Sequence, residues 1–436
     1  MKTGSFRVRW QPLVGLVAGV VVMSRLVVSG QELKHVPPAA PSFVVLHTFA
    51  GPSTDGAVPE AGLIPDPRGN LYGTTHSGGA FQNCPGGSLG CGTVFKLSPS
   101  RAETVLHSFP GGADGAYPFA GLVRDAAGNL YGTAPAGGGS DSGVVFELSP
   151  TGIETVLHSF TGGADGARPF AGLIRDASGN LYGTSLDGAA YSSACEDRHC
   201  GVVFKLSLAG TLTVLLTFTG GADGGNSLGG LIRDLAGNLY GTTMNGGDTS
   251  ACPSQGCGVV FELIRCDSTP PGYDFKVLYT FTGGADGGRS QAGLTQDGAG
   301  NLYGTTPTGG AFKRCDGGCG TVFRLSPTGT KTVLHSFAGY PTDGAGPLAS
   351  LIRDSTGNLY GTTYGGGASA HGMVFKLSRS GTETVLHSFT GGAGGAFPTS
   401  GLTQDAVGNL YGTAPAGGPI TSACPTTCGV VFRLTP

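Results

Sequence analysis

The chain has 436 residues, of which 82 are glycine, with 12% charged and 39% hydrophobic residues. It is too apolar for a disordered polymer and too rich in glycine for a mainly helical protein, so a turn-rich all-β fold is expected. The net charge of −3 excludes the basic surface that nucleic-acid binding requires.

Residues 1–30 have the layout of a secretory signal peptide. A basic start precedes an apolar run over 13–23, and the small residues Ser29 and Gly30 follow. An uncleaved membrane anchor is the alternative, but a membrane span needs about 20 apolar residues and Arg25 interrupts this segment. We therefore predict export with cleavage near Gly30, a linker over 31–42, no transmembrane domain after cleavage, and a secreted or cell-surface location, extracellular or periplasmic.

Seven copies of a tandem repeat follow, each marked by the motif NLYG. The tyrosines of this motif are Tyr72, Tyr131, Tyr182, Tyr240, Tyr303, Tyr360 and Tyr411. Successive tyrosines are 51 to 63 residues apart. A tandem period of about this length is typical of β-propeller blades.

Each copy contains four segments with strand signals. In the third copy they are residues 171–176, 180–185, 201–207 and 212–218. The segments are short, rich in β-branched and aromatic residues, and bounded by Gly, Asn, Asp or Ser, without a sustained helical period. Because the links from first to second and from third to fourth segment suit hairpins, each copy should form one antiparallel sheet.

The two ends of the repeat array complement one another. Residues 43–49 form an extra fourth strand before the first copy, and the last copy stops after its third strand at 429–434. Pairing these strands would close the ring and leave no exposed sheet edge. An open solenoid would need capping repeats of distinct composition. We predict one all-β domain over 43–436, a seven-bladed β-propeller of four-stranded blades in which the N-terminal outer strand completes the C-terminal blade.

The consensus of the copies, GLIRDASGNLYGTT followed by GVVFKLSPTGTETVLHSFTGGADGA, resembles the choice-of-anchor tandem repeat GloVer family of exported bacterial proteins. The likeness covers about residues 43–436 in seven concordant copies. It implies a propeller similar to NHL-like proteins and a secreted or surface location, but no established activity. Such proteins often end in a sorting or anchoring segment, whereas this chain ends in VVFRLTP. The resemblance leaves open free secretion and anchoring through the N-terminal apolar segment.

Two kinds of loop would share one face of the propeller, which we call the loop face. They are the links between the second and third strands and the links from a fourth strand to the next blade. The long and variable loops all fall on this face, while the opposite hairpins are nearly uniform apart from an insertion at 264–274. Loops on a rigid scaffold often carry function, so the loop face is the predicted binding face.

Ten of the 11 cysteines form close pairs in the loops between second and third strands. The pairs are Cys84 with Cys91, Cys195 with Cys200, Cys252 with Cys257, Cys315 with Cys319, and Cys424 with Cys428. Separate pairs in an exported chain indicate five local disulfides. Zinc binding is the alternative, but the spacings vary and the pairs lie in different copies. Cys266 is the eleventh and lies outside these pairs.

A second recurring loop feature is GGADG, or TDGA in two copies. Its aspartates are Asp55, Asp114, Asp165, Asp223, Asp286 and Asp343, and Gly394 takes the position in the last copy. A ring of carboxylates near the central channel could bind calcium or a cationic or hydroxyl-rich ligand, since hard cations prefer several oxygen ligands. Asp-Gly is also ordinary turn chemistry, in which the carboxylate caps local amides. We favour the turn interpretation and keep the six aspartates as candidate ligand-binding residues; no cofactor other than calcium is considered.

Five histidines share one position of the fourth strand. They are His47, His107, His158, His335 and His387. Leu216 and Tyr279 take this position in the other two copies, which indicates a requirement for bulk rather than a catalytic role. The Asp of GLIRD and the Tyr of NLYG are likewise predicted to be structural.

Polar residues that occur once on the loop face are better candidates for an enzyme site. They are His76, Arg168, Asp187, His199, Asp248, Lys313 and His371. They come from different copies, and the sequence does not show whether any two of them converge. The sequence as a whole predicts a monomeric, exported, non-catalytic binding scaffold for a polysaccharide or an extracellular protein. A propeller lyase or hydrolase acting on a polysaccharide, and a structural cell-surface protein, are the alternatives.

Overall fold

The computed structural model describes residues 27–28, 31–32, 40–51, 55–81, 84, 89–189, 195, 199–250, 252, 255–266, 272–418, 420, 424 and 428–436. The chain divides into two compact units, Met1–Ala40 and Pro41–Pro436. In the first unit, the short strands β1 (Val27–Val28) and β2 (Gln31–Glu32) pair with each other. The rest of the predicted signal peptide, and residues 33–39 of the predicted linker, lie outside the described residues. No helix in the described ranges is long and apolar enough to cross a membrane.

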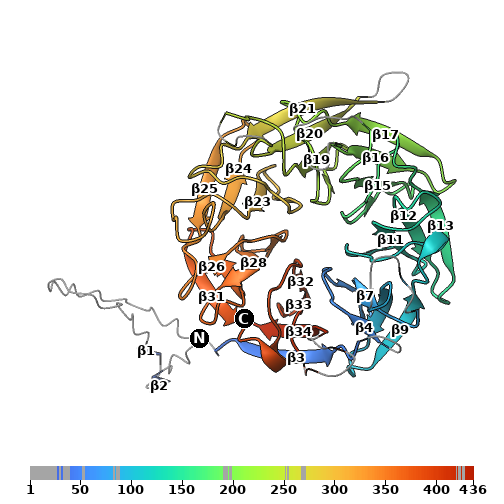
Figure 1. Cartoon of the computed structure of the whole chain (residues 1–436). Helices are drawn as coiled ribbons and strands as arrows, with labels where there is room; N and C mark the ends of the chain where they lie inside the picture. The colour runs from blue at the N-terminus through green and yellow to red at the C-terminus, as the bar shows by residue number, and fades with distance from the viewer. Residues whose placement is uncertain are drawn as a thin grey trace, which may run out of the picture. The chain divides into compact units, whose positions relative to one another are not determined.

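The second unit is a seven-bladed propeller of four-stranded antiparallel sheets arranged in a ring (Figure 1). From the axis outward, the first three blades are β5 (Ile64–Pro65), β6 (Leu71–Thr75), β8 (Thr93–Leu97) and β9 (Glu103–Ser108); β10 (Val123–Arg124), β11 (Leu130–Ala134), β12 (Val144–Leu148) and β13 (Glu154–Ser159); and β14 (Ile174–Arg175), β15 (Leu181–Thr184), β16 (Val202–Leu206) and β17 (Leu212–Thr217). The next three are β18 (Ile232–Arg233), β19 (Leu239–Thr242), β20 (Val259–Cys266) and β21 (Gly272–Thr280); β22 (Thr295–Gln296), β23 (Leu302–Thr306), β24 (Thr321–Leu325) and β25 (Lys331–Ser336); and β27 (Ile352–Arg353), β28 (Leu359–Thr363), β30 (Met373–Leu377) and β31 (Glu383–Ser388). The seventh is β32 (Thr403–Gln404), β33 (Leu410–Ala414), β34 (Val430–Thr435) and β3 (Ser42–Thr48).

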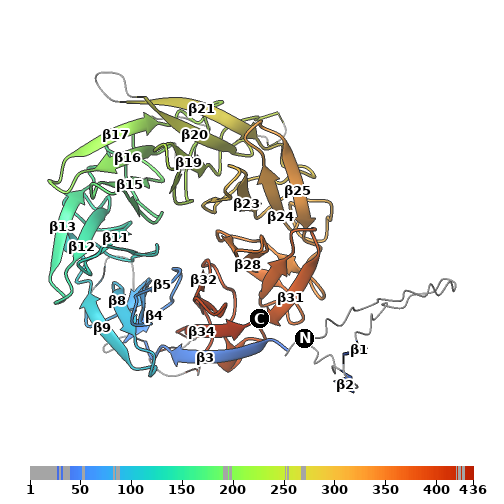
Figure 2. The same ribbon diagram turned by 180° about the vertical axis from the view of Figure 1, so that it is seen from behind.

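The seventh blade confirms the predicted closure of the ring. Strand β3 pairs antiparallel with β34, from Ser42 opposite Thr435 to Thr48 opposite Val430. Figure 2 shows this N-terminal strand on the outside of the last blade. Both ends of the propeller are therefore held in one sheet.

Minor elements lie in the loops of the loop face. Two short pairs join β4 (Gly56–Ala57) to β7 (Ser77–Gly78) and β26 (Gly344–Ala345) to β29 (Gly365–Gly366). The turns η1 (Gly112–Asp114) and η3 (Gly392–Gly394) are single 3₁₀ turns.

The inner strands are shorter than the sequence predicts, because the blades converge at the axis. Strand β14 covers Ile174–Arg175, whereas we expected residues 171–176. A Cβ atom added to Gly172 would lie 3.4 Å from the carbonyl oxygen of Gly121 in the neighbouring blade. The equivalent positions in the other copies are Gly62, Gly121, Gly230, Gly293, Ser350 and Gly401. Small residues therefore let neighbouring main chains approach closely around the channel.

Identical contacts join each blade to the next. A phenylalanine that follows the outer strand meets, edge to face, a phenylalanine in the third strand of the next blade. The pairs are Phe49–Phe95, Phe109–Phe146, Phe160–Phe204, Phe218–Phe261, Phe281–Phe323, Phe337–Phe375 and Phe389–Phe432, with ring centroids 5.2 to 5.4 Å apart. These rings are almost fully buried. The hydrophobic core of the propeller thus lies between the blades.

The YGT part of the repeat and its tyrosine have structural roles, as predicted for the tyrosine. The threonine hydroxyl donates a hydrogen bond to a main-chain carbonyl of the next blade, as from Thr133 to Ala171 and, across the closure, from Thr413 to Ala61. The tyrosine hydroxyl donates to the hairpin aspartate of its own blade, as from Tyr131 to Asp125. Burial alone would raise the pKa of Asp125, but hydrogen bonds from Asn129, Tyr131 and Gly128 hold it below its usual range.

Candidate functional site

A cavity of about 410 Å³ opens at the centre of the loop face. It is lined by Phe119, Arg168, Phe170, Leu186, Leu228, Met244, Gln291, Leu348 and Thr399. These residues belong to loops that lead into six different blades, so the cavity lies at the mouth of the central channel. Leu186 and Met244 come from the loops between second and third strands. Both kinds of loop on the loop face therefore contribute to it.

Six of the lining residues occupy one repeat position, four residues before an inner strand. The seven residues at this position, which we call the channel ring, are Glu60, Phe119, Phe170, Leu228, Gln291, Leu348 and Thr399. Each is half-buried between two buried neighbours. The position alternates with the buried side chains of the loop, so its own side chain faces the channel. No two neighbouring copies except Phe119 and Phe170 carry the same residue there.

The channel ring is mostly apolar and contains one carboxyl group. Phe119 and Phe170 meet edge to face with ring centroids 5.4 Å apart. Glu60 is the remaining member of the channel ring. Its main-chain carbonyl accepts a hydrogen bond from the hydroxyl of Thr399, which lines the cavity. Burial raises the pKa of Glu60 to about 7. This carboxyl group therefore gains or loses its charge near neutral pH.

The rim of the cavity is anchored through main-chain hydrogen bonds between blades. Two positions before the channel ring stand Val58, Tyr117, Arg168, Asn226, Arg289, Gly346 and Phe397. All seven have φ between 50° and 62°, a conformation that costs energy for a side chain other than glycine. Each N–H donates to a carbonyl of the preceding blade at 2.7 to 2.9 Å. These bonds hold the six residues other than Gly346 in their strained backbone conformation at the loop face.

The predicted disulfides supply most of those carbonyls. All five pairs are bonded, with Cα atoms 5.0 to 5.6 Å apart. The carbonyl of the second cysteine is the acceptor in five of the seven interfaces, at Cys91, Cys200, Cys257, Cys319 and Cys428. The disulfides therefore fix the acceptors that position the rim. Cys266 ends β20, and its thiol donates to Asp274.

Two of the once-occurring polar residues meet at the cavity. Arg168 donates through Nε to the carboxylate of Asp187. Asp187 is 5% exposed, whereas 39% of the Arg168 side chain is exposed, so the positive group faces the opening. The sequence left open whether any two of these residues converge, and the structure brings Arg168 and Asp187 into direct contact.

The other once-occurring residues lie in separate loops between second and third strands. His76 stacks on Tyr117 with ring centroids 5.1 Å apart, and burial lowers its pKa. His371 contacts Phe397 at the same centroid distance. The carbonyl of His199 accepts a hydrogen bond from the rim residue Asn226. Asp248 accepts hydrogen bonds from Ser250 in its own turn, and Lys313 is exposed.

The GGADG aspartates lie near the circumference, not near the channel as the ligand-binding interpretation supposed. Asp165 accepts a hydrogen bond from the Thr161 amide, and Asp223 and Asp286 make the equivalent bonds with Thr219 and Thr282. Asp55 and Asp343 likewise cap their own loops. Asp114 lies in η1. The turn interpretation therefore describes their local structure; the binding of a ligand by these residues stays a prediction.

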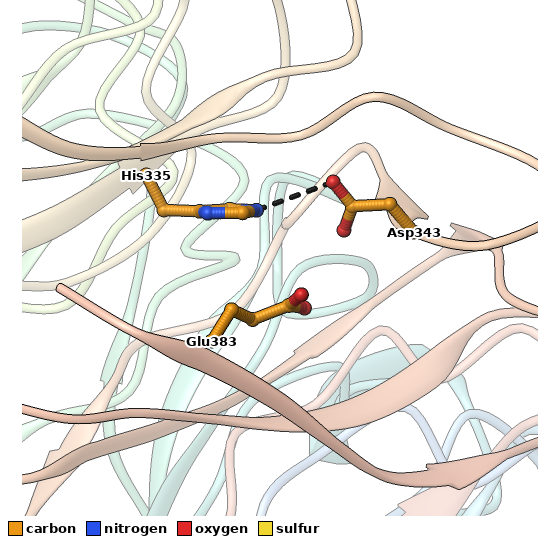
Figure 3. A group of neighbouring side chains, drawn as sticks. All are labelled: His335, Asp343 and Glu383. Carbon is orange, nitrogen blue, oxygen red and sulfur yellow. Dashed lines mark hydrogen bonds and ion pairs between the residues drawn. The ribbon is translucent and has the colours of Figure 1, made fainter. Parts of the chain in front are cut away.

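The shared position of the outer strand does more than supply bulk. His158 and His335 place Nε2 3.1 and 3.2 Å from the carboxylates of Asp165 and Asp343, and Tyr279 donates to Asp286 at 3.0 Å. Repetition of a histidine beside a repeated aspartate was the available signal for this contact. The first residue of the next outer strand completes the group, as Glu383 does beside His335 and Asp343 (Figure 3).

The channel ring was missed by reasoning from the sequence. Its members differ between copies, so they do not stand out as a motif, and Phe119 and Phe170 look like core residues. The available signal was variation at one position between constant neighbours, because the residues before and after the ring position recur from copy to copy.

The fold and the loop-face cavity define a tandem-repeat β-propeller with a variable channel mouth. The chain belongs to the Gloeobacter/Verrucomicrobia repeat family, which matches residues 33–195, 83–265 and 190–432. This match confirms the family resemblance of the repeat consensus. No curated protein matches the chain in sequence.

Several solved structures share the fold at low sequence identity. The extracellular domain of a proposed one-component system from B. thetaiotaomicron has a TM-score of 0.51 and 10% identity over 88% of this chain and 40% of that one. A proposed 6-phosphogluconolactonase from Bacteroides uniformis has a TM-score of 0.50 and 16% identity, over 79% of this chain and 89% of that one. The S511A mutant of puromycin hydrolase has a TM-score of 0.50 and 14% identity, over 83% of this chain and 50% of that one. At these identities the likeness concerns the fold alone.

Proposed function

We propose that this chain is an exported binding protein whose channel mouth receives a large apolar side chain of an extracellular protein. The observation that carries the proposal is the cavity of about 410 Å³, whose nine lining residues come from six blades and include six Phe, Leu or Met side chains. Pockets of this size and character suit an aromatic or aliphatic anchor, the kind of group that dominates protein interfaces.

The surrounding loop face supports a protein ligand more than a polysaccharide. The channel-ring aromatics are Phe119 and Phe170, whose rings carry no hydrogen-bonding group for sugar hydroxyls. The rim is pre-organised by disulfides and main-chain bonds, which reduces the entropy lost on binding. Five disulfides also suit the oxidising compartments outside the cytoplasm, where an extracellular partner would be met.

An enzyme acting on a polysaccharide is the second candidate function. The contact that favours it is the Arg168–Asp187 pair beside the cavity, since a buried carboxylate next to a cation is a common component of catalytic sites. Turnover that Asp187→Asn abolishes would establish this alternative in place of the binding function.

The binding proposal can be tested with a phage library of random peptides. Selection on the purified propeller should enrich peptides that share a large apolar residue. Phe170→Asp should weaken binding of a selected peptide by ~30-fold or more, because it places a charge where the anchor is buried. Leu235→Asp is the matched control, since Leu235 is fully exposed. Enriched peptides that bind Phe170→Asp and wild type equally would refute the proposal, as would the absence of enrichment.

A further inference from the structure

A compact group of three side chains lies between the fifth and sixth blades. His335 is in β25, Asp343 is in the loop after it, and Glu383 begins β31 of the next blade. One donor atom from each lies within 4.8 Å of the other two, and His335 Nε2 is 3.2 Å from Asp343 Oδ2. Figure 3 shows the three side chains converging from separate segments. Among the described residues, this is the one group of at least three His, Cys, Asp or Glu with such spacing.

The donor set combines one imidazole nitrogen with two carboxylates. This combination suits zinc and related divalent transition metals better than calcium, which prefers oxygen ligands alone. Asp343 is 12% exposed and His335 19% exposed, so the group is shielded but reachable from solvent. The oxygen Oε1 of Glu383 is buried and has no hydrogen-bond partner within the described part of the chain, as is also the case for Glu103 and Glu154 at the same repeat position. A buried carboxylate oxygen in that state is costly unless a cation or proton satisfies it.

The neighbouring interface, between the fourth and fifth blades, places a cation at the equivalent point. Lys331 occupies the position of Glu383, beside Tyr279 and Asp286 in place of His335 and Asp343. Its ammonium group donates to the main-chain carbonyl of Asp286 and lies 5.3 Å from the centre of the Tyr279 ring. Here the protein supplies a positive charge of its own next to the loop aspartate. The group at Glu383 has the same loop aspartate, one more carboxylate and no such lysine.

A third interface shows what happens when the aspartate is absent. At the closure of the ring Gly394 replaces the aspartate and Phe43 replaces the glutamate, so that Phe43 stacks on His387 with ring centroids 3.7 Å apart. The acidic residues are lost together, and an apolar contact takes their place. The same three residue types recur at two other interfaces, as His47, Asp55 and Glu103 and as His107, Asp114 and Glu154. Among the described residues, only His335, Asp343 and Glu383 bring three donor atoms within 4.8 Å of one another, and this spacing favours a cation at their interface.

We propose that His335, Asp343 and Glu383 bind one divalent transition-metal ion of the zinc class between the fifth and sixth blades. The two carboxylates would neutralise the charge of the ion, and the imidazole would contribute a nitrogen ligand. Because the ligands come from two blades, the ion would cross-link the interface and stabilise the folded ring. The group is remote in the repeat from the channel ring, so this site is independent of the ligand proposed above.

The experiment measures metal binding by the chain itself, in a Cys266→Ser background and without a polyhistidine tag. After dialysis against a chelator, cobalt is titrated in as a spectroscopic probe and zinc is measured by competition and by elemental analysis. One ion should bind per chain, and its binding should raise the melting temperature. Glu383→Gln should weaken cobalt binding by at least ~10-fold, because an uncharged ligand replaces a carboxylate.

Two further variants decide the outcome. Glu383→Lys copies the neighbouring interface and should abolish metal binding while the chain keeps the melting temperature of the metal-free protein. Glu154→Gln, at the same repeat position in the second blade, is the matched control and should leave one ion bound. The proposal is overturned if no saturable cobalt binding occurs up to about 1 mM, if Glu383→Lys binds like wild type, or if Glu154→Gln removes the ion equally.

Discussion

Phe204 and Phe170 belong to the same blade, yet they lie in regions of opposite character. Phe204 in β16 is fully buried and packs against Phe160 of the preceding blade, a contact that recurs at every interface. Phe170 lines the channel cavity at a position where the seven copies carry five different residue types. The comparison teaches that repeated positions hold the ring together, whereas varied positions face the place where a ligand can bind.

The closing interface offers the strongest test of the repeated region. Deleting residues 43–49 removes β3 and with it the buried Phe49 and the Phe43 stack on His387. We expect a loss of more than ~5 kcal/mol in the free energy of unfolding, because two aromatic packing sites and a full strand pairing disappear. Thermal unfolding measures the change, and a deletion of 34–39 in the predicted linker serves as control. An unchanged melting temperature would contradict closure by this strand.

Exchanging the two phenylalanines for alanine separates stability from binding. Phe204→Ala should cost about 3–5 kcal/mol of unfolding free energy, as expected for a fully buried ring. Phe170→Ala should cost less, because its ring is only half-buried, but should weaken a selected peptide by about 10-fold or more. Chemical denaturation and peptide titration of both variants give the two quantities. If Phe204→Ala weakened binding without changing stability, the division into holding and binding positions would be wrong.

The disulfides connect the two regions, since they lie in the variable loops but anchor the strained rim. Replacing Cys195 and Cys200 together by serine should lower the unfolding free energy by about 2 kcal/mol, the chain-entropy value for so short a ring. The carbonyl of Cys200 would also be held less firmly for the amide of Asn226. Hydrogen exchange at Asn226 should therefore rise, while that at Arg168, whose acceptor is Ser142, should not. If the exchange rate at the Asn226 amide were the same in the variant and the wild type, the disulfide would not hold the rim.

Much of the propeller could be predicted from the sequence because repetition reports on it directly. Seven copies, complementary chain ends and paired cysteines predict the blades, the closure and the disulfides without knowledge of any distance. The channel ring could not be found in this way. Its members, such as Glu60 and Phe170, share a place in the repeat but no common side-chain chemistry. The contact between His335 and Asp343 depends on how the outer strand curves back over its loop, and sequence spacing alone does not specify that. The short inner strands follow from crowding at the axis, which is a property of the assembled ring.

The smallest expected effect concerns pH at the closing interface. Burial lowers the pKa of His387 to about 4, so the folded ring favours the neutral imidazole that stacks on Phe43. In the unfolded chain a histidine takes up its proton near pH 6.5. The stabilisation is thus complete above about pH 6.5 and declines as the pH falls towards 4. Its loss should amount to no more than about 1 kcal/mol at pH 5, since the side chain is only half-buried and solvent screens its charge.

The variant His387→Leu tests this dependence, because the third blade carries Leu216 at the same position. It should flatten the dependence of unfolding free energy on pH between about 6.5 and 5. Denaturant titrations of both proteins measure the two slopes. Equal slopes would mean that the closing interface accepts a protonated imidazole, and that the stacked ring of Phe43 contributes shape to this interface but no preference for charge.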